Sequence, residues 1–531
     1  MIFALVVGGL ILGVLLYVAG TWNYKYFEKL GIPYVKPVPW LGNMTSFVFR
    51  QTSLMDFIAN LHKAFPDRKF IGVYEFRNPI VLVNDPELIK QITVKDFDHF
   101  IDHRFTIDPN VEPMFGRNLV SIKGNKWREM RATLSPAFTG SKMRNMFVLV
   151  TECAEELIKY LNSLESKDRT IEMKDLFTRY ANDVIASAAF GLKVDSLREP
   201  NNEFYVMTKE ISLFRGIQAL KFFGFTAFPK LMKFLNIQMF GPRIQKFYRN
   251  LVMDTMKQRD EQNIVRPDMI HLLMQVRQGT LKHEEVVDTK DAGFATVTES
   301  EIGKSSNNIT HWEDDDLTAQ AVIFLFAGFE TSSTLMCFVC HELALQPEIQ
   351  KKLQTEIDQV RSNNNKITYE VIQSMKYLDM VISETLRLWP PGIFLDRMCV
   401  KPYTIVDEDN NVKIDLKPGD GVWVAVSGIH RNPKYYPNPD TFDPERFSDS
   451  NKSSIDPYAY LPFGAGPRNC IGSRFALMEV KALVFYILES FDLEPCYKTQ
   501  IPLKLCTTSA NPTAKGGFWL DFKLRQKKPM N

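Results

Sequence analysis

Hydrophobic residues gather first at the N-terminus of the chain. Residues 1–20 carry no charged side chain and are mostly Val, Leu, Ile, Phe, Ala and Gly. As a helix, such a segment spans roughly 30 Å, about the thickness of a bilayer's hydrocarbon core. Because lysines follow at positions 25, 29 and 36, the positive-inside rule places the remainder of the chain in the cytosol. We predict a transmembrane signal anchor over residues 1–22. The alternative is a cleaved signal peptide, although a basic n-region is missing.

The pattern then changes to short elements separated by proline and glycine. Residues 23–44 contain Pro33, Pro37 and Pro39, and predict a stiff connector between the anchor and a globular body that starts at residue 45. Residues 70–83 are rich in Ile, Val, Phe and Tyr and are interrupted by Arg-Asn-Pro, which predicts a β-hairpin. Pro86 is expected to open a short helix.

From about residue 127 to 389 the pattern is mainly helical. Ile244, Phe247, Tyr248 and Leu251 follow the spacing of one buried helix face. A long apolar helix is expected from about residue 317 to 345, with an acidic run at 313–316 near its N-terminus, where negative charge is favourable. Residues 278–316 are polar and predict an exposed connector. Beyond residue 401, shorter apolar runs predict small strands and loops. The fold class is mainly α with a minor β region.

Composition narrows the range of partners. The 64 Lys and Arg residues nearly balance 62 Asp and Glu, so the net charge of +2 gives no reason to expect a nucleic-acid partner. Seven cysteines, an odd number, fit a reducing compartment better than a disulfide framework. Cys337 and Cys340 have a Cys-x-x-Cys spacing, but they lie in the long apolar helix without a second ligand pair, so we interpret them as core residues. A glycine-rich dinucleotide-binding motif preceded by a strand is not found in the sequence.

Two charged segments have open interpretations. Residues 214–240 interleave phenylalanines with lysines, a composition that suits a membrane interface and equally an aromatic core with solvated lysines. Lys126, Arg128, Lys142 and Arg144 would suit an acidic electron donor, or would simply be solvated surface charge.

The segment with the clearest chemistry is residues 463–472, which read Phe-Gly-Ala-Gly-Pro-Arg-Asn-Cys-Ile-Gly before a helical pattern over 473–488. It predicts that Cys470 lies in a glycine-rich loop at a helix N-terminus. Free N–H groups and the helix dipole there lower a thiol's pKa and favour the thiolate. A thiolate can bind a haem iron axially. The alternative is a structural cysteine beside a Gly-Pro turn.

This segment resembles the haem-binding loop of the cytochrome P-450 family. The resemblance implies that Cys470 is the iron ligand, that the glycines let the loop approach a flat macrocycle, and that Arg468 pairs with a haem propionate. The matching positions are Phe463, Gly464, Gly466, Arg468, Cys470 and Gly472.

A second matching segment lies in the long apolar helix. Alone, Ala327, Gly328 and Thr331 would be ordinary helix packing residues, and with Phe324 they share one face. In the family this helix crosses the distal side of the haem. The resemblance implies that Ala327 and Gly328 leave room for dioxygen, and that Thr331 and Glu330 support proton delivery.

The remaining matches are charged residues. Glu384 and Arg387 alone would be a surface ion pair, but with Arg446 they resemble the family's buried Glu-Arg-Arg network. Trp127 and Arg131 resemble a propionate-binding pair, and Arg397 resembles a further propionate ligand.

Together the matches imply a single haem-binding domain over residues 45–531 with the cytochrome P-450 fold and monooxygenase activity. The cofactor would be haem b, reduced with NADPH through NADPH-cytochrome P-450 reductase, with a b-type cytochrome as a further candidate donor. The implied location is the endoplasmic reticulum membrane, with the catalytic domain facing the cytosol.

Similarity in detail narrows the substrate class. Residues 36–44, 85–88 and 95–103 are similar to insect microsomal enzymes of the ninth family, many of which oxidise plant toxins and insecticides. We therefore expect small apolar xenobiotic substrates. The alternatives are a dedicated hormone or fatty acid, a peroxide-using or isomerase enzyme, and a haem or hydrophobe binder. By analogy, the pocket would be lined by residues 103–120, 214–228, 324–331, 393–395 and 506–509.

Overall fold

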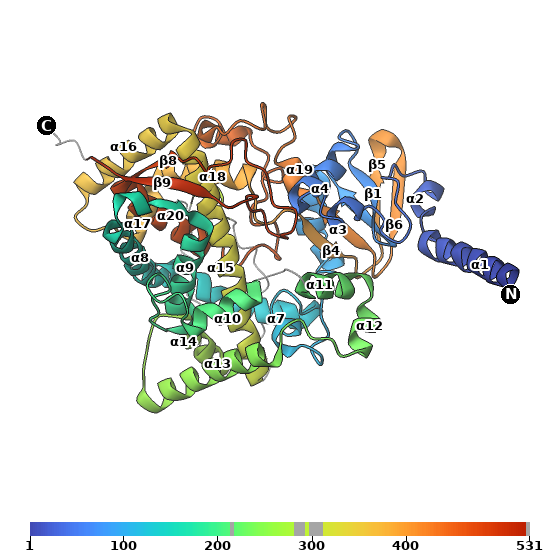
Figure 1. Ribbon diagram of the computed structural model, residues 1–531, viewed down its shortest axis with the longest axis horizontal. Helices are drawn as coiled ribbons and strands as arrows, with labels where there is room; N and C mark the ends of the chain where they lie inside the picture. The colour runs from blue at the N-terminus through green and yellow to red at the C-terminus, as the bar shows by residue number, and fades with distance from the viewer. Residues whose placement is uncertain (213–216, 281–292, 297–311, 527–531) are drawn as a thin grey trace. The chain divides into compact units, whose positions relative to one another are not determined.

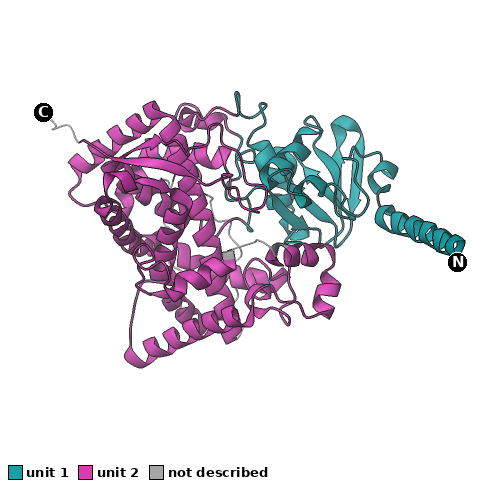
Figure 2. Ribbon diagram, viewed as in Figure 1, with its two compact units in different colours: residues 1–104, 392–439, 456–468 teal, residues 105–391, 440–455, 469–531 magenta. Residues whose placement is uncertain are grey.

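A computed structural model describes residues 1–212, 217–280, 293–296 and 312–526 (Figure 1). The chain forms two compact units, each assembled from separated stretches of sequence (Figure 2). Unit 1 comprises residues 1–104, 392–439 and 456–468, and unit 2 comprises residues 105–391, 440–455 and 469–531. The expected start of the body at residue 45 therefore does not coincide with a boundary between compact units, because residues 1–44 belong to unit 1.

The N-terminal helix α1 (Ile2–Thr21) is apolar and almost entirely exposed. The helix is 20 residues long, and its 18-residue apolar stretch has a mean hydropathy of 2.7, which makes it a candidate membrane anchor. The other described helix that is long and apolar enough to span a membrane, α15 (Asp314–Leu345), is mostly buried, as expected for a core helix.

Residues 24–44 differ from the predicted stiff connector, because they pack into unit 1. Phe27 and Ile32 are buried in the same hydrophobic cluster as Phe70 of the sheet. The Tyr24 hydroxyl donates a hydrogen bond of 2.9 Å to the carbonyl of Val38. Apolar residues ahead of the first proline, Pro33, thus bind this segment to the sheet.

The sheet of unit 1 has the strand order β1-β2-β7-β4 within the described residues, and β2 and β7 are its parallel pair. The predicted hairpin over residues 70–83 is confirmed as antiparallel β1 and β2, although β2 already begins at Asn78 and the turn is formed by Phe76 and Arg77. The short helix after Pro86 is also confirmed. The elements of unit 1 after α1 are α2 (Tyr26–Lys29), α3 (Thr45–Val48), α4 (Leu54–Lys63), β1 (Phe70–Glu75), β2 (Asn78–Val83), α5 (Pro86–Lys90), β4 (Leu395–Met398), β5 (Tyr403–Asp407), β6 (Val412–Leu416), β7 (Gly421–Val424) and α19 (Val426–Ile429).

Unit 2 is mainly helical, and α15 runs through its core. The predicted helix is confirmed and starts three residues earlier than expected, because Glu313 and Asp316 form a capping box at its N-terminus. Cys337 and Cys340 are buried in it, which confirms them as core residues. The helices of unit 2 besides α15 are α6 (Pro113–Gly116), α7 (Gly124–Leu134), α8 (Gly140–Ser163), α9 (Met173–Ile185), α10 (Glu203–Ser212), α11 (Ile217–Ala227), α12 (Pro229–Phe234), α13 (Pro242–Gln262), α14 (Met269–Arg277), α16 (Pro347–Asn363), α17 (Tyr369–Ser374), α18 (Lys376–Leu388), the short 3-10 helix η7 (Pro444–Phe447) and α20 (Ser473–Ser490).

Two sequence expectations in unit 2 need adjustment. On α13 the buried stripe continues from Ile244 and Tyr248 to Val252, whereas Phe247 and Leu251 are only half-buried. The exposed connector expected over residues 278–316 lies largely outside the described residues. Small strands beyond residue 401 are confirmed in both units, and those of unit 2 join in the order β3 (Thr170–Glu172), β9 (Trp519–Leu524), β8 (Phe491–Pro495).

Candidate functional site

Cys470 lies three residues before α20 in unit 2, as the sequence predicts. Its side chain keeps accessible surface, whereas Asn469 and Ser473 on either side are buried. The expected lowering of the thiol pKa is wrong. Desolvation by the surrounding protein raises the pKa of Cys470, and the N–H of Gly472 and the charge of Arg131 oppose this without outweighing it.

Arg131 secures the residue before the cysteine. Trp127 and Arg131 are both buried on α7. The Arg131 guanidinium donates to the carbonyl of Asn469 at 3.0 Å and to its Oδ1 at 2.6 Å. This two-point contact holds the Cys470 loop against α7. A role of Trp127 and Arg131 toward a propionate stays a prediction.

The glycines of the loop have separate structural reasons. Gly464 and Gly466 both have positive φ, at 76° and 70°. A β-carbon on Gly466 would overlap the carbonyl oxygen of Thr93, so the close neighbour here is backbone of unit 1. Gly472 has no such restriction, since a β-carbon there would make only ordinary contact with Phe138.

Unit 1 positions two arginines of the predicted site, together with a half-buried Phe463. Arg468 donates through Nε to the carbonyl of Ile101 at 2.8 Å, and its Nη2 lies 3.7 Å from Asp102 Oδ1. Arg397 on β4 is only 1% exposed and donates through Nη1 to the carbonyl of Asp396 at 2.8 Å.

The Nε and Nη2 groups of Arg397 are buried and have no hydrogen-bond partner among the described residues. Buried charged donors are normally paired, so these two indicate the binding position of an anionic ligand group. The neighbouring Asp396 carboxylate does not fill this role, because it accepts from His103 Nδ1 and from the N–H of Arg104. Sequence reasoning placed His103 in a pocket segment but missed Asp396 and the pairing of the two, which spans almost three hundred residues.

The predicted face of α15 is the open side of an otherwise buried helix. Ala327 is exposed, and Phe324, Gly328 and Thr331 are half-buried. The Thr331 hydroxyl donates to the carbonyl of Ala327 at 2.5 Å. A β-carbon on Gly328 would crowd Ile185 of α9, so its small size also serves helix packing.

Glu330 does not share this face with Thr331. Its carboxylate forms an ion pair of 3.0 Å with Lys174 of α9. Lys174 also donates to the hydroxyls of Ser333 at 2.8 Å and Thr334 at 2.9 Å. Proton delivery from Glu330 would therefore require this pair to open. No pattern in the sequence indicates Lys174, because its contact with Glu330 depends on how α9 packs against α15.

Glu384, Arg387 and Arg446 lie together in unit 2. Arg387 donates through Nε and Nη2 to the two carboxylate oxygens of Glu384 at 2.7 and 2.8 Å. Arg446 Nε lies 3.4 Å from Glu384 Oε1, which also accepts the N–H of Asp443 at 2.9 Å. Arg387 further donates to the carbonyl of Thr441. Burial raises the pKa of Glu384, and the two arginines oppose that shift.

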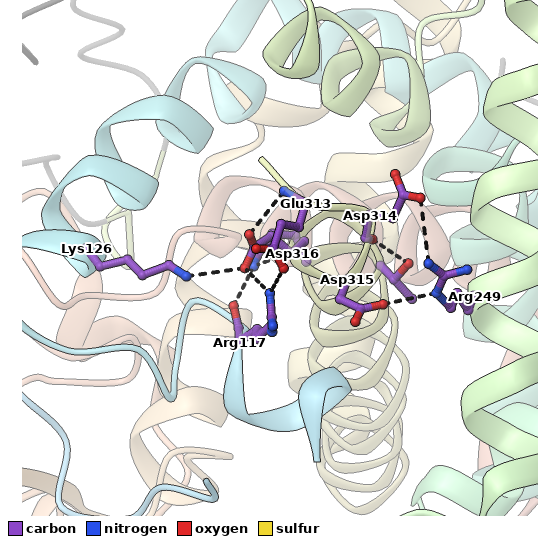
Figure 3. A network of polar contacts seen from close by, with 9 residues as sticks. Arg117, Lys126, Arg249, Glu313, Asp314, Asp315 and Asp316 are labelled. Carbon is purple, nitrogen blue, oxygen red and sulfur yellow. Dashed lines mark hydrogen bonds and ion pairs between the residues drawn. The ribbon is translucent and has the colours of Figure 1, made fainter. Parts of the chain in front are cut away.

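The predicted basic cluster is partly used inside the protein. Lys126 lies 3.3 Å from Asp316 and Arg144 is paired with Glu370. Figure 3 shows Lys126 and Arg117 converging on the capping carboxylates of α15, while Arg249 reaches the adjacent Asp314 and Asp315. These cations stabilise the start of α15 from three segments of unit 2.

Aromatic side chains from two predicted pocket segments meet in unit 2. The ring of Phe105 lies 5.9 Å from Phe115 and 4.9 Å from Phe222. Phe324 of α15 contacts Phe138 at 5.3 Å. Beside them is a cavity of about 660 Å³, bounded by parts of residues 106–126 and 225–233. Its lining is richer in lysine than the apolar pocket that was expected, and includes Lys123, Lys126, Lys230 and Lys233.

In residues 214–240, where phenylalanines and lysines are interleaved, one part matches the aromatic-core interpretation and another the membrane-interface interpretation. Phe225 is buried, as expected for a core aromatic. Leu231, Phe234 and Leu235 are 51%, 83% and 54% exposed beside Lys230 and Lys233. The α12 end thus has the character of an interfacial surface, while Phe214 lies outside the described residues.

Comparison with known proteins agrees with this geometry. The family model described as Cytochrome P450 matches residues 32–518. The chain is 50% identical to "Cytochrome P450 9e2" of Blattella germanica, with 96% of each chain covered. It is 44% identical to "Probable cytochrome P450 9f2" of Drosophila melanogaster, covering 95% of this chain and 96% of that protein, and 38% identical to "Cytochrome P450 6k1" of Blattella germanica, covering 94% and 93%. The chain therefore belongs to the cytochrome P450 family of monooxygenases, and it is similar to the ninth-family members of insects.

Proposed function

We propose that this chain is a membrane-anchored haem-thiolate monooxygenase that inserts one atom of dioxygen into small apolar compounds, principally xenobiotics such as plant toxins or insecticides. The observation that carries the proposal is the accessible Cys470 at the start of α20, held through Asn469 by Arg131, in a chain that matches the family over nearly its full length.

The donor set suits haem b. Cys470 offers a sulfur ligand with accessible surface, and Arg397 offers two unpaired, buried N–H groups to a propionate carboxylate. Bound haem would supply the oxygen chemistry that no side chain can perform. Phe463, Gly464, Gly472 and Arg468 complete the proposed cofactor-binding set, with Trp127 and Arg131.

The protein's own residues would then position ligands and protons. Ala327 and Gly328 have small side chains, so they leave space at the open face of α15. The Thr331 hydroxyl, which donates a hydrogen bond to the carbonyl of Ala327, can rotate to donate toward a ligand on that face. Glu330 would supply protons through water once its pair with Lys174 opens. Glu384, Arg387 and Arg446 would hold the fold around the Cys470 loop and take no part in the chemistry.

The aromatic cluster of Phe105, Phe115 and Phe222 supports apolar substrates, because such rings bind by area and adapt to shape. A dedicated hormone or fatty acid would use the same surface. If the enzyme oxidises several unrelated apolar insecticides with similar kcat/KM, that result supports the xenobiotic assignment. Turnover of a single endogenous lipid would replace it.

Membrane attachment and electron supply complete the proposal. The exposed α1 would anchor the protein in the endoplasmic reticulum membrane, with the body in the cytosol, and the exposed apolar residues of α12 would contact lipid. NADPH-cytochrome P450 reductase would deliver the electrons, with a b-type cytochrome as a second donor. A peroxide-using enzyme or an isomerase would turn over without reductase, so activity that depends on NADPH and reductase excludes both.

The deciding experiment is the absorption spectrum of the reduced, carbon-monoxide-bound protein. We expect the long-wavelength Soret band of thiolate-ligated haem, and its loss in Cys470→Ala. Cys496→Ala, which changes a partly accessible cysteine outside the predicted pocket segments, is the matched control and should keep the band. A histidine-type spectrum in the native protein, or an unchanged spectrum in Cys470→Ala, would contradict the proposal.

A further inference from the structure

Residues 293–296 form a short described segment of unit 2. It contacts elements of the same unit that are distant from it in the sequence. It reads Gly-Phe-Ala-Thr, and Thr296 donates its N–H to the carbonyl of Gly293 at 3.2 Å, so it forms a tight turn. Ala295 is buried although the surrounding sequence is polar. Burial of so small a segment requires a built receiving surface.

That surface contains a buried ion pair. Lys481 of α20 is fully buried, and its Nζ lies 2.8 Å from Asp379 Oδ1 of α18. The other carboxylate oxygen of Asp379 accepts the backbone N–H of Phe294 at 2.8 Å. The segment thus donates a hydrogen bond to the carboxylate whose other oxygen compensates the buried ammonium.

The glycine and the phenylalanine fit this surface by shape. Gly293 has a φ of 95°, and a β-carbon there would overlap Asp379 Oδ1 and lie 3.0 Å from Lys481 Nζ. The Phe294 ring packs edge-on against Phe447 of η7 with centroids 5.0 Å apart. One segment therefore touches α18, η7 and α20 together.

We propose that residues 293–296 are an intramolecular peptide ligand, and that the site formed by Asp379, Phe447 and Lys481 binds them to couple α18, η7 and α20. These elements also carry Glu384, Arg446 and, just before α20, Cys470. The bound segment is a positioning element, because it fixes α18 relative to α20, the helix that follows the cysteine loop. This consequence for Cys470 rests on the proposed function, whereas the binding of the segment does not.

Hydrogen exchange of the full-length, haem-loaded protein, followed by mass spectrometry, tests the binding. Gly293→Ala and Phe294→Ala should each increase amide exchange in α18 and α20 by about tenfold, because the segment's contacts close local opening of these helices. Gly516→Ala is the matched glycine control, since Gly516 has a φ of 92° and open space around it. Phe49→Ala, at an exposed phenylalanine, is the matched ring control. Both controls should stay within about twofold of the native protein.

A double-mutant cycle then identifies the receiving site. Asp379→Ala is combined with Lys481→Met so that no uncompensated charge remains buried. In that background, Gly293→Ala should change exchange by at most about twofold, because the carboxylate that accepts the Phe294 N–H is gone and the segment is no longer bound there. Exchange in Gly293→Ala and Phe294→Ala that matches the controls would overturn the proposal, and so would an equal effect of Gly293→Ala in both backgrounds.

The spectrum of the reduced, carbon-monoxide-bound protein tests the consequence for Cys470. On warming, Phe294→Ala should lose the thiolate-type band about tenfold faster than Phe49→Ala. An equal rate would refute positioning of the cysteine loop. A native protein without that band would refute the proposed function, while the exchange results would still decide whether the segment is bound.

Discussion

Two buried acidic sites in unit 2 satisfy their charges in opposite ways. Glu384 is fully buried, and both of its carboxylate oxygens accept from Arg387, with Arg446 and the N–H of Asp443 adding further contacts. Glu479 on α20 is equally buried, but among the described residues it has no cationic partner and only the Ser332 hydroxyl stabilises its charged form. Burial raises its pKa to about 8, and the hydroxyl of Ser332 opposes this only in part.

The difference separates a buried charge that has a structural role from a buried group whose protonation state can change. A carboxylate with two arginines is a fixed charge whose partners must all be present. A buried carboxyl without a counter-charge is kept neutral by its surroundings and titrates near physiological pH. Arg397 of unit 1 differs from both, because its guanidinium stays charged while two of its buried nitrogen donors have no partner among the described residues.

The largest effect is expected at the paired site. Arg387→Met should lower the free energy of unfolding by roughly 3–5 kcal/mol, since Glu384 would keep only the longer contact with Arg446 and the hydrogen bond from the N–H of Asp443. Urea unfolding of purified protein, or the yield of folded protein where the loss is too great, measures it. The double variant Glu384→Leu with Arg387→Met should recover part of the loss. A single variant as stable as the native protein would show that the network does not stabilise the fold.

Glu479→Gln should give the next largest change, and with opposite sign. The folded-state pKa of Glu479 is raised from 4.5 to about 8, so the folded protein binds more protons than the unfolded chain across this range. Its stability therefore falls as pH rises from about 4.5 to 8, and the neutral glutamine removes this loss. Unfolding should show the variant more stable by roughly 2–4 kcal/mol at pH 8, with little difference near pH 4.5. The exposed Glu348→Gln is the control, and equal pH profiles for all three proteins would contradict the assignment.

Arg397→Met separates ligand binding from folding. Because Nε and Nη2 are already unpaired, their removal should leave the apoprotein as stable as before or slightly more stable. Haem should dissociate about tenfold faster, since the charged bonds to a propionate are lost. Transfer of haem to an excess of apomyoglobin measures this rate. The exposed Arg50→Met should match the native protein. Haem loss at the native rate in Arg397→Met would argue against the propionate role.

The smallest effect is expected beside the network, on the surface. Lys352 pairs with Glu445, next to Arg446, and their side chains are 57% and 48% exposed. Lys352→Ala should cost under about 1 kcal/mol, and the ion-pair part of this loss should disappear at high salt. Urea unfolding at low and high salt checks both. If Lys352→Ala lowered the free energy of unfolding as much as Arg387→Met, solvent exposure would not explain the difference between the Lys352–Glu445 and Glu384–Arg387 pairs.

The sequence by itself determined the elements whose signal is local. The apolar run of α1, the hairpin over residues 70–83, the capped α15 and the glycine-rich loop before α20 all follow from periodicity, turn residues and capping groups within a few positions. The placement of Glu384 and Arg387 one helical turn apart is of the same kind.

Tertiary structure decided every contact between distant segments. Arg446 reaches Glu384 across 62 positions, Lys174 holds Glu330, the carbonyl of Thr93 occupies the space that Gly466 leaves open, and Phe294 donates to Asp379. The raised pKa of Cys470 also depends on how much protein surrounds the sulfur and not on its helix end alone. A local pattern encodes which face of an element is apolar, but burial and charge pairing depend on which other element packs against that face.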